Sequence, residues 1–385
     1  MDKGQTMTAG GSTLAVAGPL RLDVAGIGRL IAVLWAAGYR VIGPTVGEGA
    51  IVYGEVRTTA DLPIGYTDEQ DAGHYRLVRR DDGALFGYNV GPHSLKRLLL
   101  PPRERLFTTI RTGKKIEVQP EPLPSEKVAF LGAKACELRA MLTQDGVFSS
   151  EQHPDLQYLA RRKGMFIVGV SCTKAGGTCF CSSMGSGPKF EDGADLALTE
   201  VVGPQEHYFV VEVKSAAGAD LVAQLALSPA SVDERRQAEL RVADAATQMG
   251  RHLATVGLKE LLARSSESSH WDSIASRCLS CANCTLVCPT CFCNTVEDVT
   301  ELEGDHSERW RRWDSCFHDD FSYLHGGSVR QSVKSRYRQW LTHKLSTWID
   351  QFGTSGCVGC GRCITFCPVG IDLTAECKTL QASNP

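Results

Sequence analysis

Hydrophobic and polar positions alternate in short blocks through the first half of the chain. The apolar spacing of residues 23–37 predicts an amphipathic helix. Runs rich in β-branched and aromatic residues predict short strands around Val41, over 51–56 and over 75–78. Because helical and strand-like segments alternate from about residue 23 to residue 209, the pattern predicts an α/β or α+β domain.

Two apolar runs in this region are each followed by cysteines. Residues 127–131, KVAFL, form a predicted buried strand, and a helix-like segment follows over 136–142. A second run, 165–170, leads directly into a cysteine-rich loop. Ligands usually bind at the carboxyl ends of strands in open α/β sheets, so we expect both cysteine segments at such an edge.

The pattern changes after residue 200. Residues 201–213 are typical of a hairpin interrupted by Gly203 and Pro204. Residues 231–265 are rich in Ala, Leu, Glu and Arg and lack proline, which predicts a long helix or a helix pair that acts as a connector.

The bulk composition is that of an ordinary globular protein. At 385 residues, with 43% hydrophobic and 22% charged residues, the chain has room for two or three domains. Its net charge of -3 gives no signature of nucleic-acid binding. The apolar stretch over 30–37 is far shorter than the roughly 20 residues of a membrane span. The start of the chain lacks the apolar core of a secretory signal, so the expected compartment is the cytoplasm.

The cysteines carry the clearest chemical signal. Eight of the sixteen form two copies of the pattern CxxCxxCxxxCP, the ligand run of a bacterial-type ferredoxin with 4Fe-4S clusters. In two-cluster ferredoxins the fourth cysteine of each run binds the other cluster. The predicted ligand sets are therefore Cys278, Cys281, Cys284 and Cys367 for one cluster, and Cys357, Cys360, Cys363 and Cys288 for the other.

Zinc and disulfides are the alternatives for these eight residues. Zinc typically takes two CxxC pairs that close one tetrahedron, whereas this pattern has two runs of four followed by proline. Disulfide frameworks belong to short secreted domains. The long segment between Cys288 and Cys357 has much helical character, and compact β-hairpin ferredoxins have shorter gaps. We therefore expect an α+β protein with an α/β-like domain over 1–230, a helical connector over 231–264 and an α-helical ferredoxin-like domain with two 4Fe-4S clusters over 265–385.

Four further cysteines follow the two predicted strands. Four thiols suffice for a third 4Fe-4S cluster, with zinc as the main rival. Alternatively, each is a separate buried cysteine that packs as a small hydrophobic residue. This N-terminal set comprises Cys136, Cys172, Cys179 and Cys181.

Three more cysteines could bind an additional cluster, but no spacing rule requires it. Cys291 and Cys293 follow the first run in PTCFC, and Cys316 lies in RRWDSCFHDD. The fourth ligand would have to come from a partner or from Asp314, His318 or Asp319. The alternative is that these cysteines pack in the cluster domain. Cys377 we interpret as structural.

A basic run extends from Arg330 to Lys344 and contains Tyr337 and Trp340. It could bind an acidic partner, although such runs are more often the solvated face of an amphipathic helix.

Motifs for substrate chemistry are absent from the sequence. There is no GxGxxG, P-loop, HExxH or GxSxG. Clusters exchange single electrons and nicotinamide exchanges pairs, so a flavin must mediate if NAD(P) is the terminal reactant. We expect that flavin on another subunit.

The motifs KAC, GGTCFCSSMG, CLSCANCTLVCPTCFC, WDSC and CVGCGRCITFCP together resemble the beta subunit of cytoplasmic group 3b NiFe hydrogenases, the sulfhydrogenases. The chain is also similar to the electron-transfer subunit of anaerobic sulfite reductase. The resemblance spans about 128–368 and implies a non-catalytic electron-transfer subunit. Its ligands would be the eight ferredoxin cysteines and the N-terminal set. Ala282 departs from the glycine that related runs commonly have, and a methyl group should be tolerated there if φ is negative.

The resemblance also implies partners. A subunit with FAD and NAD(P), and the small and large subunits of a NiFe hydrogenase, would flank this chain; in the alternative complex, the partner is a sirohaem sulfite reductase subunit. Neither nucleic acid nor a membrane span is expected. Two other hypotheses stay open: the chain itself reduces sulfur or polysulfide at a cluster near Cys181, or its N-terminal cysteines bind zinc in a docking platform.

Overall fold

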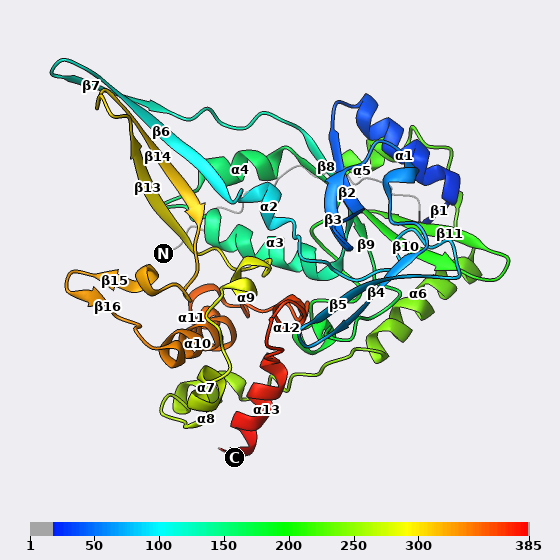
Figure 1. Cartoon of the computed structure of the whole chain (residues 1–385). Coiled ribbons are helices and arrows are strands. Elements are labelled where there is room, and N and C mark those ends of the chain that lie inside the picture. Colours follow the sequence, from blue (N-terminus) through cyan, green and yellow to red (C-terminus); the bar gives the residue numbers. More distant parts are fainter. Residues whose placement is uncertain (1–17, 384–385) are drawn as a thin grey trace, which may run out of the picture.

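A computed structural model describes residues 18–383 of the chain. Figure 1 shows a large sheet flanked by helices, a long extension made of strands, and a mainly helical part that contains the C-terminus. Helices and sheets are both prominent, as the predicted mixed fold requires. The start of the chain, where no secretory signal is predicted, lies outside the described residues. Within those residues, no helix has the length and hydropathy needed to cross a membrane.

The large sheet has eight strands in the order β12-β1-β11-β10-β9-β8-β2-β3. Its centre is parallel, since β2, β8, β9 and β10 pair in parallel, whereas the flanking strands pair antiparallel. The strands are β1 (Leu20–Asp23), β2 (Arg40–Gly47), β3 (Ala50–Glu55), β8 (Val128–Ala133), β9 (Met165–Val170), β10 (Leu196–Val202), β11 (His207–Val213) and β12 (Ser228–Pro229).

Helices cover both faces of this sheet, which explains the continuous apolar run of β9. Phe166 packs in one core with Ile27 of α1, whereas Ile167 packs in another with Leu138 of α3. Side chains that alternate between two buried faces must all be apolar. The covering helices are α1 (Val24–Ala36), α3 (Ala135–Phe148), α4 (Leu156–Lys163), α5 (Ala216–Val222) and α6 (Val232–Thr247).

The predicted local elements of this half are confirmed. The helix predicted over 23–37 is α1, and the Asp23 side chain caps it by accepting a hydrogen bond from the Gly26 amide at 2.8 Å. The hairpin predicted over 201–213 is formed by β10 and β11. The helix pair predicted over 231–265 is α6 and α7 (Leu258–Arg264), whereas its role as a connector stays a prediction.

The segment between the two ferredoxin runs is helical only in its second half, so the prediction for its first half is wrong. There β13 (Asn294–Thr300) and β14 (His306–Trp313) form a hairpin, and β14 pairs antiparallel with β6 (Arg103–Thr112) from the N-terminal half. With β7 (Lys115–Pro120) they make a four-stranded sheet.

Charge rather than apolar alternation holds this hairpin together, and its sequence therefore gave no strand signal. Arg309 and Asp298, opposite each other on the two strands, form an ion pair at 2.7 Å. Arg312 and Glu297 form another at 3.0 Å. Cross-strand pairs of opposite charge stabilise a sheet without any hydrophobic period.

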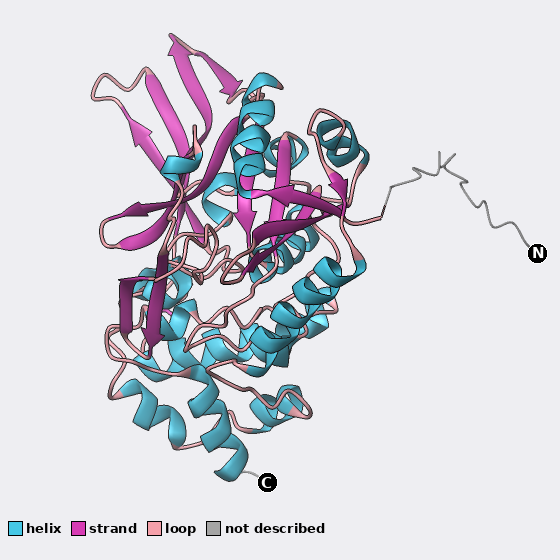
Figure 2. Cartoon of the chain, turned by 90° about the vertical axis from the view of Figure 1, so that its right-hand side faces the viewer, coloured by secondary structure: helices cyan, strands magenta, loops and turns pink. Residues whose placement is uncertain are grey.

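Most of the remaining helices form a mainly helical part, in the lower half of Figure 2. Its core contains Trp271, Tyr337, Trp340 and Leu341, and several cysteines pack against that core. The domain boundaries at 231 and 264 stay a prediction. The helices are α8 (His270–Ala275), α9 (Asn283–Leu286), α10 (Val333–Thr342), a π-helical turn (His343–Thr347), α11 (Trp348–Phe352), α12 (Arg362–Thr365) and α13 (Leu373–Ser383).

Smaller elements occur in both halves of the chain. They are the 3₁₀ turns Thr59–Asp61, Cys181–Met184 and Asp319–Ser322, the short helix α2 (Lys96–Leu99), and the strands β4 (Tyr66–Asp71), β5 (His74–Arg79), β15 (Tyr323–Leu324) and β16 (Gly327–Ser328).

Candidate metal centres

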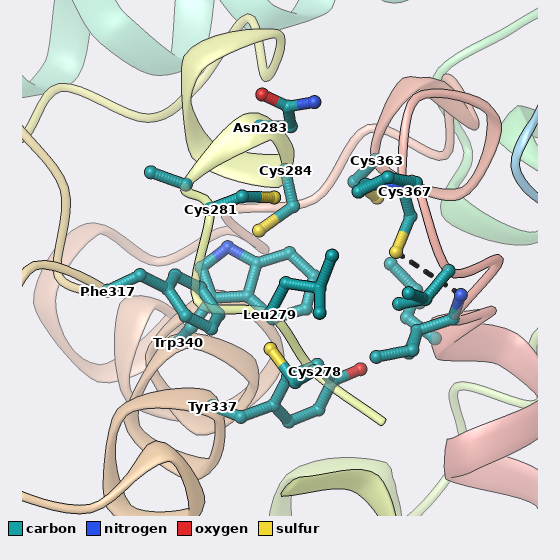
Figure 3. A pocket seen from close by; sticks show the side chains of 15 residues that line it. Cys278, Leu279, Cys281, Asn283, Cys284, Phe317, Tyr337, Trp340, Cys363 and Cys367 are labelled. Carbon is teal, nitrogen blue, oxygen red and sulfur yellow. Dashed lines mark hydrogen bonds between the residues drawn. The ribbon is translucent and has the colours of Figure 1, made fainter. Parts of the chain in front are cut away.

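The first predicted ligand set lines a single cavity, here called the first cavity. Cys281 and Cys284 lie on one side of it and Cys367 on the other, with Cys278 below (Figure 3). Cys278 accepts a hydrogen bond from the Ser280 amide at 3.5 Å. Cys367 accepts one from the Ile371 amide at 3.3 Å. The structure thus brings together three residues of one run and the last cysteine of the other.

The walls of the first cavity are apolar and aromatic. Phe317, Tyr337 and Trp340 form one side (Figure 3). Burial, together with the sulfurs of Cys278 and Cys367, raises the pKa of Cys284 well above its usual value. The Cys284 thiol therefore resists ionisation until a cation neutralises it.

The first ferredoxin loop has an unfavourable backbone at Ala282. This residue is buried, and its φ is +66°. The sequence predicts that a methyl group is tolerated there only if φ is negative, and that condition is not met. Gly361, at the equivalent place in the second run, has φ of +76°. A side chain in this left-handed region is strained by roughly 1 kcal/mol.

Ala282→Gly is expected to stabilise the protein by about 0.5 kcal/mol, because relief of the strain slightly exceeds the extra entropy of glycine in the unfolded chain. Thermal unfolding under anaerobic conditions measures the change. Gly361→Ala is the matched control, since its new Cβ would lie 2.4 Å from the Thr178 carbonyl oxygen. A loss of stability in Ala282→Gly, or none in Gly361→Ala, would contradict this account.

The second predicted set, Cys288, Cys357, Cys360 and Cys363, also converges. Burial raises the pKa of Cys363, and the nearby sulfurs of the other three raise it further. Burial likewise raises the pKa of Cys357 to about 12. Cys357 accepts a hydrogen bond from the Gly359 amide at 3.4 Å. Cys363 in addition lines the first cavity, so the two sets adjoin.

The four N-terminal cysteines line another cavity, here called the N-terminal cavity. Cys136 lies in the first turn of α3, directly after β8, and the other three follow β9. Because β8 and β9 are parallel, their carboxyl ends meet at one edge of the sheet, as the sequence predicted. Burial raises the pKa of Cys179 to about 12. The cavity is lined by Cys136, Cys172, Cys179 and Cys181, and also by Cys360 of the second set.

These sets do not have the geometry of a site for one metal ion. Among residues 18–383, no group of three or more His, Cys, Asp or Glu side chains is close enough to hold a single metal ion. A cubane spaces its thiolates further apart than a single ion does, because each thiolate binds a different iron. Cavities lined by four cysteines fit that larger group.

Glycine lets the second run approach the N-terminal cavity. A Cβ on Gly359 would lie 2.6 Å from the Phe180 carbonyl oxygen and 2.7 Å from the Cys181 nitrogen. The Phe180 amide donates to the Gly359 carbonyl oxygen at 2.9 Å. This close packing of backbones places the two loops side by side.

A buried ion pair that sequence reasoning missed fixes the same junction. Arg362 lies between two cysteines of the second run, and Glu137 directly follows Cys136; their side chains pair, and both are 0% exposed. Arg362 also donates to the carbonyl oxygens of Gly91 and His93, both at 2.9 Å. In the sequence, the only sign of this ion pair was a charged residue next to or between the cysteines in each of the two motifs.

The additional cysteines lie close to both ferredoxin sets, since Cys291 neighbours Cys288 of the second set and Cys316 lies near Cys284 of the first. The Cys291 thiol donates a hydrogen bond to Cys288 and thereby lowers the pKa of Cys288. Similarly, a hydrogen bond from Cys316 lowers the pKa of Cys293 to about 7.

The residues suggested as a fourth ligand for these cysteines have other partners. His318 and Asp314 form a pair at 2.5 Å, and Asp319 pairs with Arg336. The structure thus brings the three thiols close to the ferredoxin sets, while Asp314, His318 and Asp319 are engaged in other ion pairs.

The basic run over 330–344 is not simply a solvated face. Arg336 is 6% exposed and Lys344 is 3% exposed. Lys344 lies in the π-helical turn and points inward, and its Nζ donates to the Cys288 sulfur at 3.1 Å. Lys96, also buried, donates to the Leu286 carbonyl oxygen at 3.1 Å, close to the same thiols. The interpretation as a solvated face is therefore wrong for Arg336 and Lys344.

Comparison with known proteins agrees with the cysteine pattern. Residues 277–371 match the model of a family described as a 4Fe-4S dicluster domain. A curated relative, the sulfhydrogenase 2 subunit beta of Pyrococcus furiosus, is 32% identical over 280 residues, which cover 72% of this chain and 79% of the relative. No solved structure matches the chain.

Proposed function

The chain belongs to the family of sulfhydrogenase beta subunits, and from that premise we propose that it carries electrons between a flavin subunit that handles NAD(P)H and a NiFe hydrogenase. Three 4Fe-4S clusters would be held by the two ferredoxin sets and the N-terminal set.

One observation carries this proposal: the second set shares a residue with the wall of each neighbouring cavity. Cys363 lines the first cavity, and Cys360 lines the N-terminal cavity. These shared residues support a path that runs from the first set through the second to the N-terminal set. It begins at the surface, because Cys281 is exposed and the neighbouring Leu279 is 63% exposed.

Residues of this chain would bind the clusters and exclude water from them. A 4Fe-4S cluster, when bound, takes up and releases one electron at a time. The cysteine thiolates hold it, and the amides of Ser280, Gly359 and Ile371 donate hydrogen bonds to sulfur. Such donors stabilise added negative charge. The aromatic wall of the first cavity excludes water. Nicotinamide exchanges electron pairs, so the proposal assigns FAD and NAD(P) to a partner subunit.

Iron, zinc and acid-labile sulfide per chain, measured anaerobically, test the number of clusters. Each cubane holds four irons, so we expect about 12 irons and no zinc. About 16 irons would add a cluster at Cys291, Cys293 and Cys316. About 8 irons with one zinc would contradict the N-terminal cluster and favour a zinc platform.

Purification of the native complex tests the partners. The proposal expects a nickel-containing partner and hydrogen-dependent reduction of NAD(P). A sirohaem partner would instead assign the chain to a sulfite reductase. Sulfide production by the isolated chain with dithionite and polysulfide would make it a catalyst in its own right, and would overturn its role as a carrier only.

A further inference from the structure

Lys344 is a buried cation with a sulfur partner. Its Nζ donates to the Cys288 sulfur at 3.1 Å, to the Thr290 hydroxyl at 3.1 Å and to the Gly356 carbonyl oxygen at 3.2 Å. Within the described residues, no carboxylate oxygen lies within 4 Å of this Nζ. The only anion that these contacts offer Lys344 is therefore a cysteine thiolate.

A buried ammonium group at Lys344 requires a negative charge nearby, and the Cys288 sulfur is the group in contact that can carry it. A buried, unpaired ammonium group is costly, because it loses its hydration and gains no compensating charge. The three hydrogen bonds use all three donors of the ammonium group. Lys344 is thus held in one position, with its Nζ against the Cys288 sulfur.

Two lysines, Lys134 and Lys174, line the N-terminal cavity, and Lys134 is the buried one. Lys134 is 2% exposed and lines that cavity. Its Nζ donates to the Phe86 carbonyl oxygen at 2.8 Å and lies 4.7 Å from the centre of the Tyr88 ring. None of the fifteen residues that line the first cavity is charged. Two of the three ligand sets therefore have a fixed positive charge beside them, and one does not.

We infer that Lys344 raises the reduction potential of the cluster held by Cys288, Cys357, Cys360 and Cys363, and that Lys134 does the same for the N-terminal cluster. The inference rests on the proposed function, since it presumes that these cysteines hold clusters. Reduction adds one electron and no proton to the cluster, so a nearby fixed cation stabilises the reduced form more than the oxidised form. Low polarity around a buried charge strengthens this effect.

Redox titration of the full chain with dithionite, followed by electron paramagnetic resonance, tests the inference. The signals are assigned through Cys360→Ala, which should remove the second cluster, and Cys136→Ala, which should remove the N-terminal one. At the wild-type midpoint, Lys344→Met should raise the oxidised-to-reduced ratio of the second cluster about tenfold, which for one electron is about 59 mV. Lys134→Met should change the N-terminal cluster by a similar factor and leave the second nearly unchanged.

The charge-conserving variant Lys344→Arg separates charge from packing, and its ratio should stay within about twofold of wild type. The inference is overturned if Lys344→Met keeps its iron and no ratio changes, or if Lys344→Arg shifts the ratio as much as Lys344→Met does.

If Lys344→Met loses the cluster, wild-type protein labelled with ¹⁵N at the lysine side chains gives the answer. Pulsed resonance should then show a lysine nitrogen coupled to the second cluster, and its absence would overturn the inference. Wild-type protein without clusters would instead contradict the proposed function itself.

Discussion

Cys360→Ala is expected to remove one cluster and to stop electron transfer between the two partners, while each partner keeps its own dye-linked activity. Cys360 is buried, belongs to the middle set of the path and also lines the N-terminal cavity. A path broken at its middle cannot be bypassed through the sets at its ends. Iron per chain should fall by about four. Hydrogen-dependent NAD(P) reduction by the complex should fall at least about a hundredfold, since transfer depends on the missing cluster.

Cys377→Ala is the matched control for this variant. Cys377 is 0% exposed in α13 but lines neither the first nor the N-terminal cavity. Its replacement removes a small buried side chain, so iron content and electron transfer should stay near wild type, with a stability loss of about 1 kcal/mol. If Cys360→Ala also abolished the dye-linked activities of both partners, Cys360 would have a folding role instead.

Arg362→Met should destabilise the protein by about 3 to 5 kcal/mol, because it leaves the Glu137 carboxylate buried without its partner. The Arg362 side chain also donates to two backbone carbonyl oxygens, and a methionine cannot replace those hydrogen bonds. The midpoint of urea unfolding, measured anaerobically with clusters bound, reports the loss.

Two comparisons make this prediction specific. In the double variant Arg362→Met with Glu137→Gln, part of the loss should be recovered, because no isolated charge remains buried. Arg309→Met breaks an exposed pair with Asp298 and should cost less than about 1 kcal/mol. Equal losses for Arg362→Met and Arg309→Met would mean that the buried pair has no special role in joining the second run to α3.

Sequence patterns predicted the features that depend on short stretches of chain. The strand before Cys136 and the strand before Cys172 were readable because every residue of such a strand must be apolar when both faces are covered. The crossed grouping of the ferredoxin cysteines followed from their spacing alone, and the structure places Cys367 with the first run. That these residues bind iron stays a prediction.

Features that depend on contacts between distant parts of the chain could not be predicted from local sequence patterns. Half of the eight residues of β14 are charged, and the strand is stabilised by residues of β6, so it has no hydrophobic period of its own. Lys344 looked like a surface residue because its sulfur partner, Cys288, lies 56 positions earlier. The shape of the loop imposes the positive φ of Ala282. The conformational preference of alanine is for negative φ, so the sequence alone predicts the opposite sign.

The pairing of β14 with β6 also matters while the protein is being made. Arg105 on β6 and its ion-pair partner Glu308 on β14 are 203 positions apart. At a synthesis rate of about 5 to 20 residues per second, β6 waits roughly 10 to 40 s for its neighbour to leave the ribosome. During that time its edge is open to other chains, and the charged side chains along β6 protect it from mispairing. The chain must therefore be nearly complete before its N-terminal half reaches its final form, and a nascent chain stalled before residue 306 would be a target for chaperones.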